Sequence, residues 1–227
     1  MNYLALDIGN VICDVDLNPF FSYMNQFDSK LSTEEAFIVC EEMQPRLDLA
    51  LSSIDSELER ICLHHNRSRD KHHKELKQLW LNSIKPVPQI NEILNELILD
   101  GVKIALLSNI GMDHATVVRN ILPIDNCLQH FSCEVGARKP SKLYFQSFEL
   151  DYPQFWNGYI RSYSEDMTSY YPQKPLYIDD RRENLFAAEN YFHTQYFSIK
   201  DYTDYDLAAS KLKELLLHNH YLSSPAE

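Results

Sequence analysis

Short apolar runs that end in small or acidic residues alternate with helical patterns along this chain. The first run covers residues 4–6 and is broken by Asp7, Gly9 and Asn10. An apolar run cut off by turn-forming residues is typical of a buried strand that reaches its loop. Comparable runs predict four further strands, at 102–109, 131–136, 175–180 and 195–199. Strands that alternate with helices predict a doubly wound parallel sheet of the α/β class.

Helical periodicity fills the gaps between these strands. The segment that opens at Pro86 and closes at Gly101 has apolar residues at positions i, i+3, i+4 and i+7. This spacing is that of an amphipathic helix, and a glycine is a common helix end. Similar patterns predict helices over 113–122, 143–150, 183–191 and 207–218.

The segment 14–88 differs from the rest because it is rich in polar residues and has no strand-like run. Helix-start signals and helical patterns recur along it. We therefore predict two domains. Residues 1–15 and 86–227 would form the α/β core, and residues 16–85 would form an all-helical domain inserted after the first strand.

Composition and charge narrow the class of protein. The chain has 227 residues, of which 44% are hydrophobic and 24% charged, as in ordinary globular proteins. Its net charge of −12 argues against binding to nucleic acid or to an anionic membrane surface. No apolar stretch approaches the ~20 residues of a membrane span, and the N-terminus lacks the basic segment of a signal peptide. The five cysteines lack zinc-type spacing, so we expect free thiols in a cytoplasmic protein.

Four of the predicted strands end in residues that can react with or bind phosphate. They are Asp7 after the first strand, Ser108 and Asn109 after the second, Lys139 after the third, and Asp179 and Asp180 after the fourth. Each residue alone is more often a turn former, a helix cap or a solvated side chain. Because the carboxyl ends of parallel strands meet at one edge of a sheet, their joint occurrence predicts a single site.

These residue types suit phosphoryl transfer, whose catalysis rests on positioning and electrostatic stabilisation. The Asp7 carboxylate can attack phosphorus, and carboxylates at Asp7 and Asp180 suit Mg²⁺, which prefers oxygen ligands. The Ser108 hydroxyl and the Asn109 amide can receive a phosphoryl oxygen. Lys139 would supply the positive charge that this acidic chain otherwise lacks.

Four ordered motifs resemble those of hydrolases of the haloacid dehalogenase (HAD) superfamily. They are Asp-Ile-Gly-Asn-Val, Leu-Leu-Ser-Asn, Ala-Arg-Lys-Pro and Ile-Asp-Asp-Arg-Arg-Glu-Asn. The resemblance covers the core from residue 1 to about residue 199. It implies a Rossmann-type, three-layer α/β/α core, and it makes the helical insertion a cap domain. It also implies a Mg²⁺-dependent phosphatase that acts on a small phosphorylated metabolite.

The same resemblance implies roles for the residues that bind the substrate. Asp7 would be the nucleophile that forms an aspartyl phosphate. Ser108 and Lys139 would bind the transferring phosphoryl group. Asn184 resembles the asparagine that often follows the paired acids and supports their loop.

The metal ligands also follow from the resemblance. Asp7, Asp180 and the main-chain carbonyl of Gly9 would bind Mg²⁺ directly. Asp179 would act through a water molecule. The metal would hold one phosphoryl oxygen and reduce the repulsion between an anionic substrate and the nucleophile.

Gly9 departs from the common pattern of these phosphatases. Most of them carry a second Asp two residues after the nucleophile, which protonates the leaving oxygen and then activates water. The form Asp-x-Gly-Asn-Val resembles a subgroup that includes bacterial sugar-1-phosphate phosphatases, so a sugar phosphate is a candidate substrate. The general acid is unassigned, and Asp14, Asp16 and His114 are candidates by proximity in the sequence.

Two other functions fit the same motifs. A 2-haloacid dehalogenase also lacks the second Asp, but it needs no metal, and the paired acids Asp179 and Asp180 speak against it. A catalytically weak phosphate-binding or regulatory protein is the other alternative, which Gly9 suggests. The sequence leaves the substrate and the oligomeric state open.

Two further features invite interpretation. The pairs His64-His65 and His72-His73 flank a basic patch, where either a metal site or a solvated helix and turn is expected. The Tyr-rich stretch 152–172 makes one connection long, and it is either a substrate-facing flap or a surface loop.

Overall fold

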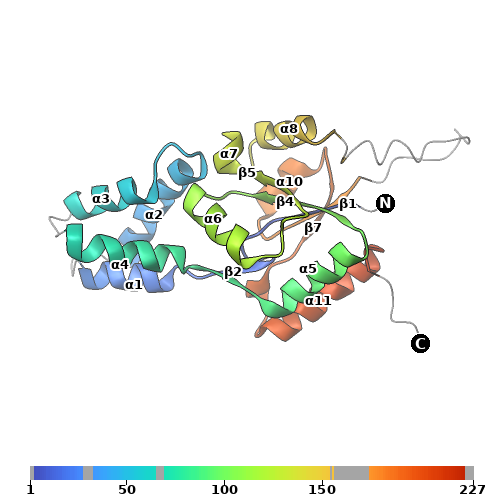
Figure 1. Ribbon diagram of the computed structural model, residues 1–227, viewed down its shortest axis with the longest axis horizontal. Helices are drawn as coiled ribbons and strands as arrows, with labels where there is room; N and C mark the ends of the chain where they lie inside the picture. Colours follow the sequence, from blue (N-terminus) through green and yellow to red (C-terminus); the bar gives the residue numbers. More distant parts are fainter. Residues whose placement is uncertain (1–2, 28–32, 65–68, 154, 156–173, 223–227) are drawn as a thin grey trace, which may run out of the picture.

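A five-stranded parallel sheet lies at the centre of the larger part of the molecule (Figure 1). The computed structural model describes residues 3–27, 33–64, 69–153, 155 and 174–222. The strands are β1 (Tyr3–Leu6), β4 (Lys103–Ser108), β5 (Leu128–Phe131), β6 (Leu176–Asp179) and β7 (His193–Tyr196).

The strand order is β5-β4-β1-β6-β7, and every neighbouring pair is parallel. The chain runs outward from β1 through β4 to β5, then crosses back to β6 beside β1 and ends at β7. The order therefore reverses between β1 and β6. In open α/β sheets this switch point is where ligands bind, outside the carboxyl ends of the strands.

Helices cover both faces of the sheet. One face carries α5 (Pro88–Leu99), α6 (Met112–Ile121) and α11 (Tyr205–His218), and the other carries α8 (Lys142–Asp151) and α10 (Arg182–Ala188). Leu4 and Leu6 of β1 are buried in the first core, and Ala5 between them is buried in the second. Successive side chains of a strand point to opposite faces, so both faces need apolar cover. This three-layer arrangement confirms the predicted α/β fold class.

A separate group of four helices lies at one end of the sheet (Figure 1). The group, here called the helical insertion, consists of α1 (Asn18–Phe27), α2 (Thr33–Asp48), α3 (Ile54–His64) and α4 (Arg69–Leu81). It has its own apolar core, in which Phe20, Leu58 and Trp80 are buried. The exact domain boundaries at residues 16 and 85 stay a prediction.

Two short strands join the helical insertion to the core. β2 (Cys13–Val15) pairs antiparallel with β3 (Ile84–Pro86). The expectation of a purely helical segment over 16–85 is therefore wrong at its end, where Ile84 and Lys85 are extended. Strands of three residues are too short to show an alternating pattern, and they form here because the two chain passages run side by side.

The third core strand lies earlier in the chain than expected. β5 ends at Phe131, and Ser132–Val135 form a short helix, α7, which Gly136 ends with a left-handed φ of 67°. The polar residues Gln129 and His130 hide this strand from a hydrophobicity pattern. His130 is nevertheless buried, and its Nε2 donates a hydrogen bond to the Tyr144 carbonyl oxygen at 3.1 Å. The last core strand is likewise shifted, because Ile199 begins a 3₁₀ turn (Ile199–Asp201).

An ion pair between buried Glu57 and half-buried Arg46 joins two helices of the insertion. Glu57 of α3 accepts hydrogen bonds from Nε and Nη2 of Arg46 on α2, both at 2.8 Å, and contacts Arg60 Nη2 at 2.9 Å. These hydrogen bonds from Arg46 lower the pKa of Glu57 to about 2, against the opposing effect of burial. A pKa below the unfolded value means that ionised Glu57 stabilises the folded state above pH ~4.5, and that this stability is lost as pH falls toward 2.

We expect Glu57→Gln to lower the free energy of unfolding by about 2 kcal/mol at pH 7, because it leaves Arg46 without its charged partner. The difference from the wild type should shrink as pH falls from 4.5 toward 2. Urea unfolding at several pH values measures both effects. Glu41→Gln removes an exposed acid of α2 and should change little. Equal stability of wild type and Glu57→Gln at pH 7 would contradict the assignment.

Candidate active site

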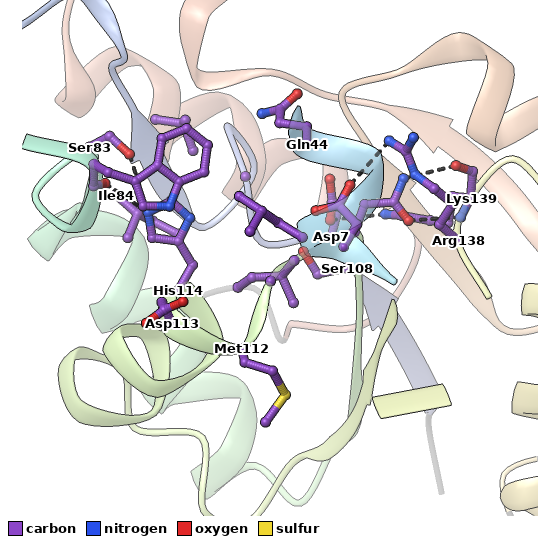
Figure 2. Close-up of a pocket in the computed structure, with 18 of the residues that line it drawn as sticks. Asp7, Gln44, Ser83, Ile84, Ser108, Met112, Asp113, His114, Arg138 and Lys139 are labelled. Carbon is purple, nitrogen blue, oxygen red and sulfur yellow. Dashed lines mark hydrogen bonds and ion pairs between the residues drawn. The ribbon is translucent and has the colours of Figure 1, made fainter. Parts of the chain in front are cut away.

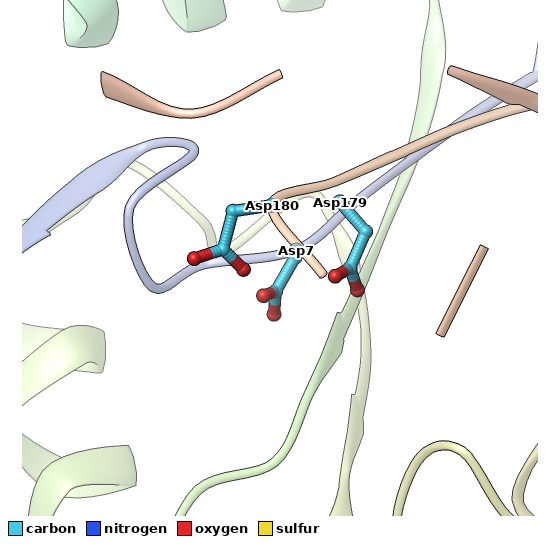
Figure 3. Close-up of side chains that lie close together, drawn as sticks. All are labelled: Asp7, Asp179 and Asp180. Carbon is cyan, nitrogen blue, oxygen red and sulfur yellow. The ribbon is translucent and has the colours of Figure 1, made fainter. Parts of the chain in front are cut away.

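Three carboxylates meet at the switch point of the sheet. Asp7 follows β1, Asp179 ends β6, and Asp180 follows it. One oxygen of each lies within 4.8 Å of the others, and Figure 3 shows the three side chains pointing to the same side. The parallel pairing of β1 with β6 places them together, because it aligns the carboxyl ends of the two strands.

Lys139 lies buried between two of these acids. Its Nζ is 2.9 Å from Asp7 Oδ1 and 2.7 Å from Asp179 Oδ2, and it donates to the Leu107 carbonyl oxygen at 2.7 Å. Burial alone would lower the pKa of Lys139, but the charges of Asp179 and Asp7 raise it. The side chain is therefore a fixed cation at the carboxyl edge of the sheet.

Asp179 is held by protein groups on both of its oxygens. Besides Lys139, it accepts hydrogen bonds from the Tyr177 hydroxyl, from the Arg181 backbone N–H at 2.8 Å and from Asn184 Nδ2 at 3.0 Å. Burial acts to raise the pKa of Asp179, but Lys139 and these donors keep it below its usual value. A carboxylate has about four lone-pair sites, so little capacity is left for a direct metal bond. Asn184 supports this acid as the motif implies.

Asp7 lies among more negative than positive charges. Burial raises the pKa of Asp7 to about 7, and although Lys139 opposes the shift, Asp179 and Asp180 add to it. Burial also raises the pKa of Asp180, whose Oδ2 accepts a hydrogen bond from Asn10 Nδ2 at 3.0 Å. Three acids against one lysine make a site that a divalent cation with oxygen ligands would balance. The residues present therefore fit Mg²⁺.

Asn10 is a site residue that the sequence did not single out. It has a φ of 55°, which Asn tolerates better than most residues. In this conformation its Oδ1 also accepts the backbone N–H of Val15 at 3.3 Å. One side chain thus joins the loop after β1 to Asp180. The sequence showed only that Asn10 is an asparagine in a predicted turn.

Asn109 has a different contact from the one expected. Its Nδ2 donates to the Lys139 carbonyl oxygen at 2.8 Å, and its Oδ1 accepts the Lys139 backbone N–H at 2.7 Å. Both polar atoms of the amide are engaged with the main chain of Lys139. Asn109 therefore positions the lysine. Its amide nitrogen has a second N–H, and the residue lines the cavity, so the expectation that it receives a phosphoryl oxygen stays a prediction. Ser108 is buried at the end of β4 and lines the cavity beside Asp7.

A cavity of about 470 Å³ opens between this edge and the helical insertion (Figure 2). Asp7, Gly9 and Lys139 line it from the core, and Gln44 and Asp48 of α2 line it from the insertion. A Cβ added to Gly9 would meet only Val15 Cγ2, at 3.5 Å. Space at this position therefore does not exclude a side chain.

The three candidates for the general acid are engaged elsewhere. Asp14 pairs with Lys200 and accepts the Tyr205 hydroxyl at 2.8 Å. Asp16 Oδ1 accepts the Asn18 backbone N–H at 3.0 Å at the start of α1. Neither lines the cavity.

His114 does line the cavity, but on the side of Ser83 and away from Asp7 (Figure 2). Its ring stacks on Trp80, and its Nε2 lies 2.8 Å from the Trp80 carbonyl oxygen. Because a carbonyl only accepts, Nε2 carries the hydrogen. Burial lowers the pKa of His114, so the ring is neutral at pH 7 and its only proton is committed to Trp80.

Asp48 and Arg138 form a contact that sequence reasoning missed. Asp48 Oδ2, at the end of α2, is 3.1 Å from Arg138 Nη2 in the core. Arg138 belongs to the Ala-Arg-Lys-Pro motif, but Asp48 has no signal beyond its place at a helix end. The ion pair joins the helical insertion to the segment that carries Lys139.

The two remaining sequence features lie largely outside the described residues. His65, the side chain of His64 and the stretch 156–172 fall there. Of the other histidines, His72 Nδ1 contacts the Tyr23 hydroxyl at 3.0 Å, and His73 Nε2 contacts the Asp55 carbonyl oxygen at 3.2 Å. Within the described part of the chain, the only group of three or more potential metal ligands is that of Asp7.

All five cysteines are free and buried. In the ranges that the structure describes, no helix has both the length and the apolar character needed to cross a membrane.

Comparisons with known proteins identify the fold. No family model and no curated protein matched the sequence. A solved HAD family enzyme from Bacteroides thetaiotaomicron is similar with a TM-score of 0.67 at 16% identity, covering 88% of this chain and 94% of that one. A HAD phosphatase from Thermococcus onnurineus has a TM-score of 0.56 at 15% identity, with 95% and 98% covered. An L-2-haloacid dehalogenase has a TM-score of 0.55 at 15% identity, with 87% and 85% covered. The resemblance to the HAD superfamily is thus confirmed at the level of the fold.

Proposed function

We propose that this chain, which has the fold of HAD-family enzymes, is a Mg²⁺-dependent phosphatase of a small phosphorylated metabolite. The observation that carries the proposal is the set of side chains at the switch point. Asp7 lies there with a buried lysine on one oxygen and two further acids beside it, facing the cavity between the sheet edge and the helical insertion. This is what a carboxylate nucleophile for an anionic phosphoryl group requires.

In the proposed reaction, the Asp7 carboxylate attacks phosphorus as the bond from phosphorus to the leaving oxygen of the substrate breaks. Water then hydrolyses the aspartyl phosphate that has formed. Lys139 holds the Asp7 carboxylate and offers its charge to the phosphoryl oxygens, with the Ser108 hydroxyl as a second donor. Asn109 keeps Lys139 in place through its main chain. Asp179 holds the lysine from the other side and keeps it protonated.

The residues that would hold Mg²⁺ are Asp7, Asp180 and the main-chain carbonyl of Gly9, with Asp179 acting through water. When bound there, the cation would neutralise charge on the phosphoryl oxygens and on Asp7. A structure of the Bacteroides thetaiotaomicron enzyme holds magnesium and inorganic phosphate, which supports the choice of metal for a chain of the same fold.

The cavity supports a small substrate. A volume of about 470 Å³ lies in the range of pockets for small metabolites, and a sugar phosphate would fit both this size and the Asp-x-Gly-Asn-Val motif. The helical insertion beside the cavity would also limit the access of bulk water to the reacting groups.

A panel assay tests the function. Phosphate release from sugar phosphates, aryl phosphates and acyl phosphates is measured with Mg²⁺ and with a chelator, and halide release from 2-chloropropionate is measured in parallel. We expect phosphate release that depends on Mg²⁺. Halide release without metal would support the dehalogenase alternative instead. Phosphate binding without turnover of any compound would support the regulatory alternative.

We expect Mg²⁺ to stabilise the protein, because it balances the three acids only in the folded state. Saturation to about 100 times the dissociation constant corresponds to about 2.7 kcal/mol, or a rise in Tm of roughly 5–10 °C for a chain of this size. Thermal unfolding with and without Mg²⁺ measures it. Asp180→Asn should remove most of the shift, whereas Asp125→Asn, at an exposed position, should keep it. A Tm that does not change when Mg²⁺ is added would contradict the metal site.

A further inference from the structure

The proposed phosphatase needs a group that donates a proton to the leaving oxygen, and the residues considered above do not supply one. Position 9 offers no carboxyl, although there is room for a side chain. Asp14 and Asp16 hold other groups, and the His114 proton is committed to Trp80. A donor must therefore come from another part of the cavity.

Asp48 is an acid in the right part of the molecule. It is the last residue of α2, it is buried, and it lines the same cavity as Asp7. Its partner Arg138 directly precedes Lys139, whose Nζ contacts Asp7, and Arg138 and Lys139 both line this cavity too. α2 packs against the core at α7, so Asp48 is held at the boundary between insertion and core.

The direction of the reaction points to the same place. In phosphoryl transfer, the attacking and leaving oxygens lie roughly in line on opposite sides of phosphorus. Asp7 attacks from the edge of the sheet, so the leaving group is directed toward the side of the cavity that the helical insertion covers. Asp48 lies on that side.

We propose that Asp48 is the general acid and base of this phosphatase, which places the proton donor on the helical insertion rather than two residues after the nucleophile. As Asp7 forms its bond to phosphorus and the bond to the leaving oxygen breaks, the Asp48 carboxyl gives its proton to that oxygen. The Asp48 carboxylate then takes a proton from the attacking water. The water oxygen bonds to phosphorus as the bond between phosphorus and Asp7 breaks, inorganic phosphate leaves, and the Asp48 carboxyl is restored. This inference rests on the proposed function.

The surroundings of Asp48 suit this work. Burial raises the pKa of Asp48 to about 6, although Arg138, Lys139 and Arg181 act to lower it. A general acid and base works best with a pKa near the operating pH. Arg138 is a positioning residue that holds the carboxyl through Nη2. Its Nε is buried and has no hydrogen-bond partner among the described residues.

The test compares two classes of substrate in Asp48→Asn. An aryl phosphate such as p-nitrophenyl phosphate leaves as a stable anion, whereas an alkyl phosphate such as glycerol phosphate needs its proton in the transition state. We expect kcat/KM, which reports the steps up to departure of the leaving group, to fall by about 10²–10⁴-fold for the alkyl phosphate and to change far less for the aryl phosphate. Asn keeps the volume of Asp48, and an unchanged Tm shows that the variant is folded.

The control and the contrary outcomes are distinct. Asp55→Asn removes another ion-paired acid of the insertion, 2.6 Å from Lys77, which does not line the cavity, and it should leave both rates unchanged. Equal losses of kcat/KM on the two substrates, or no loss on either, would overturn the role of Asp48 alone. A wild type that releases phosphate from neither class would overturn the proposed function and this inference with it. If Asp48→Asn does not fold, the wild type decides the question across a series of leaving groups, where a steep fall of kcat/KM with leaving-group pKa would refute acid catalysis.

Discussion

Replacing Asp7 with Asn is expected to abolish phosphate release, with a loss on the order of 10⁴-fold or more, as for other nucleophile deletions. An amide is a poor nucleophile and a weak metal ligand, so both the covalent step and Mg²⁺ binding suffer. The fold should remain, because Asn has nearly the same volume and takes one negative charge out of a crowded group. The pKa of Asp7, raised to about 7 by burial, means that its ionised form costs stability at neutral and higher pH.

Phosphate release and thermal unfolding of Asp7→Asn together decide this prediction. The matched control is Asp125→Asn, which makes the same change at an exposed site and should keep full activity. Turnover close to that of the wild type in folded Asp7→Asn would rule out the aspartyl phosphate.

Replacing Lys139 with Met should damage stability as well as activity. The lysine is buried and its Nζ touches both Asp7 and Asp179, so its removal leaves two buried acids without their cation. Breaking a buried pair in this way typically costs about 3–5 kcal/mol. Turnover should be lost as well, because the charge that receives the phosphoryl oxygens is gone.

Urea unfolding with and without Mg²⁺ tests the stability effect. The metal should recover part of the loss in Lys139→Met, since it supplies positive charge to the same acids. Lys142→Met alters an exposed lysine three residues away and should be close to the wild type in both assays. A Lys139→Met protein as stable as the wild type would show that the acids are not ionised together.

The core fold could be predicted from the sequence because parallel strands bring all of their carboxyl ends to one edge of the sheet. Once the strands are parallel, residues such as Asp7 and Asp180 that end them must share an edge, whatever their side chains do. The sequence did not reveal side-chain partners. Asn109 is a polar residue at a strand end, and nothing in its own segment indicates the contact with Lys139, which depends on a loop thirty residues away.

Asp48 was beyond sequence reasoning for a related reason. A helix-end Asp is common, and its value here comes from the way in which α2 docks beside Arg138. The short strands β2 and β3 were missed similarly, because each is stabilised by the other and neither has a pattern of its own. Features that depend on two distant segments meeting leave no mark on either segment alone.

The pairing of β2 with β3 also affects how the chain folds. In the sequence, the whole insertion lies between β1 and the other core strands. Cys13 pairs with Pro86 across this interval. If the insertion were unfolded, bringing these two residues together would close a long loop, which costs entropy and slows folding. When α1 has packed on α4, the two ends of the insertion are already together, and Asp16 N–H bonds the Ser83 carbonyl oxygen at 2.8 Å. The folded insertion then acts as a tight turn, and the core assembles as if its first strand were joined directly to α5. Glu57→Gln weakens the insertion, so slower refolding of the core in this variant, measured by stopped flow, would support folding of the insertion before the core.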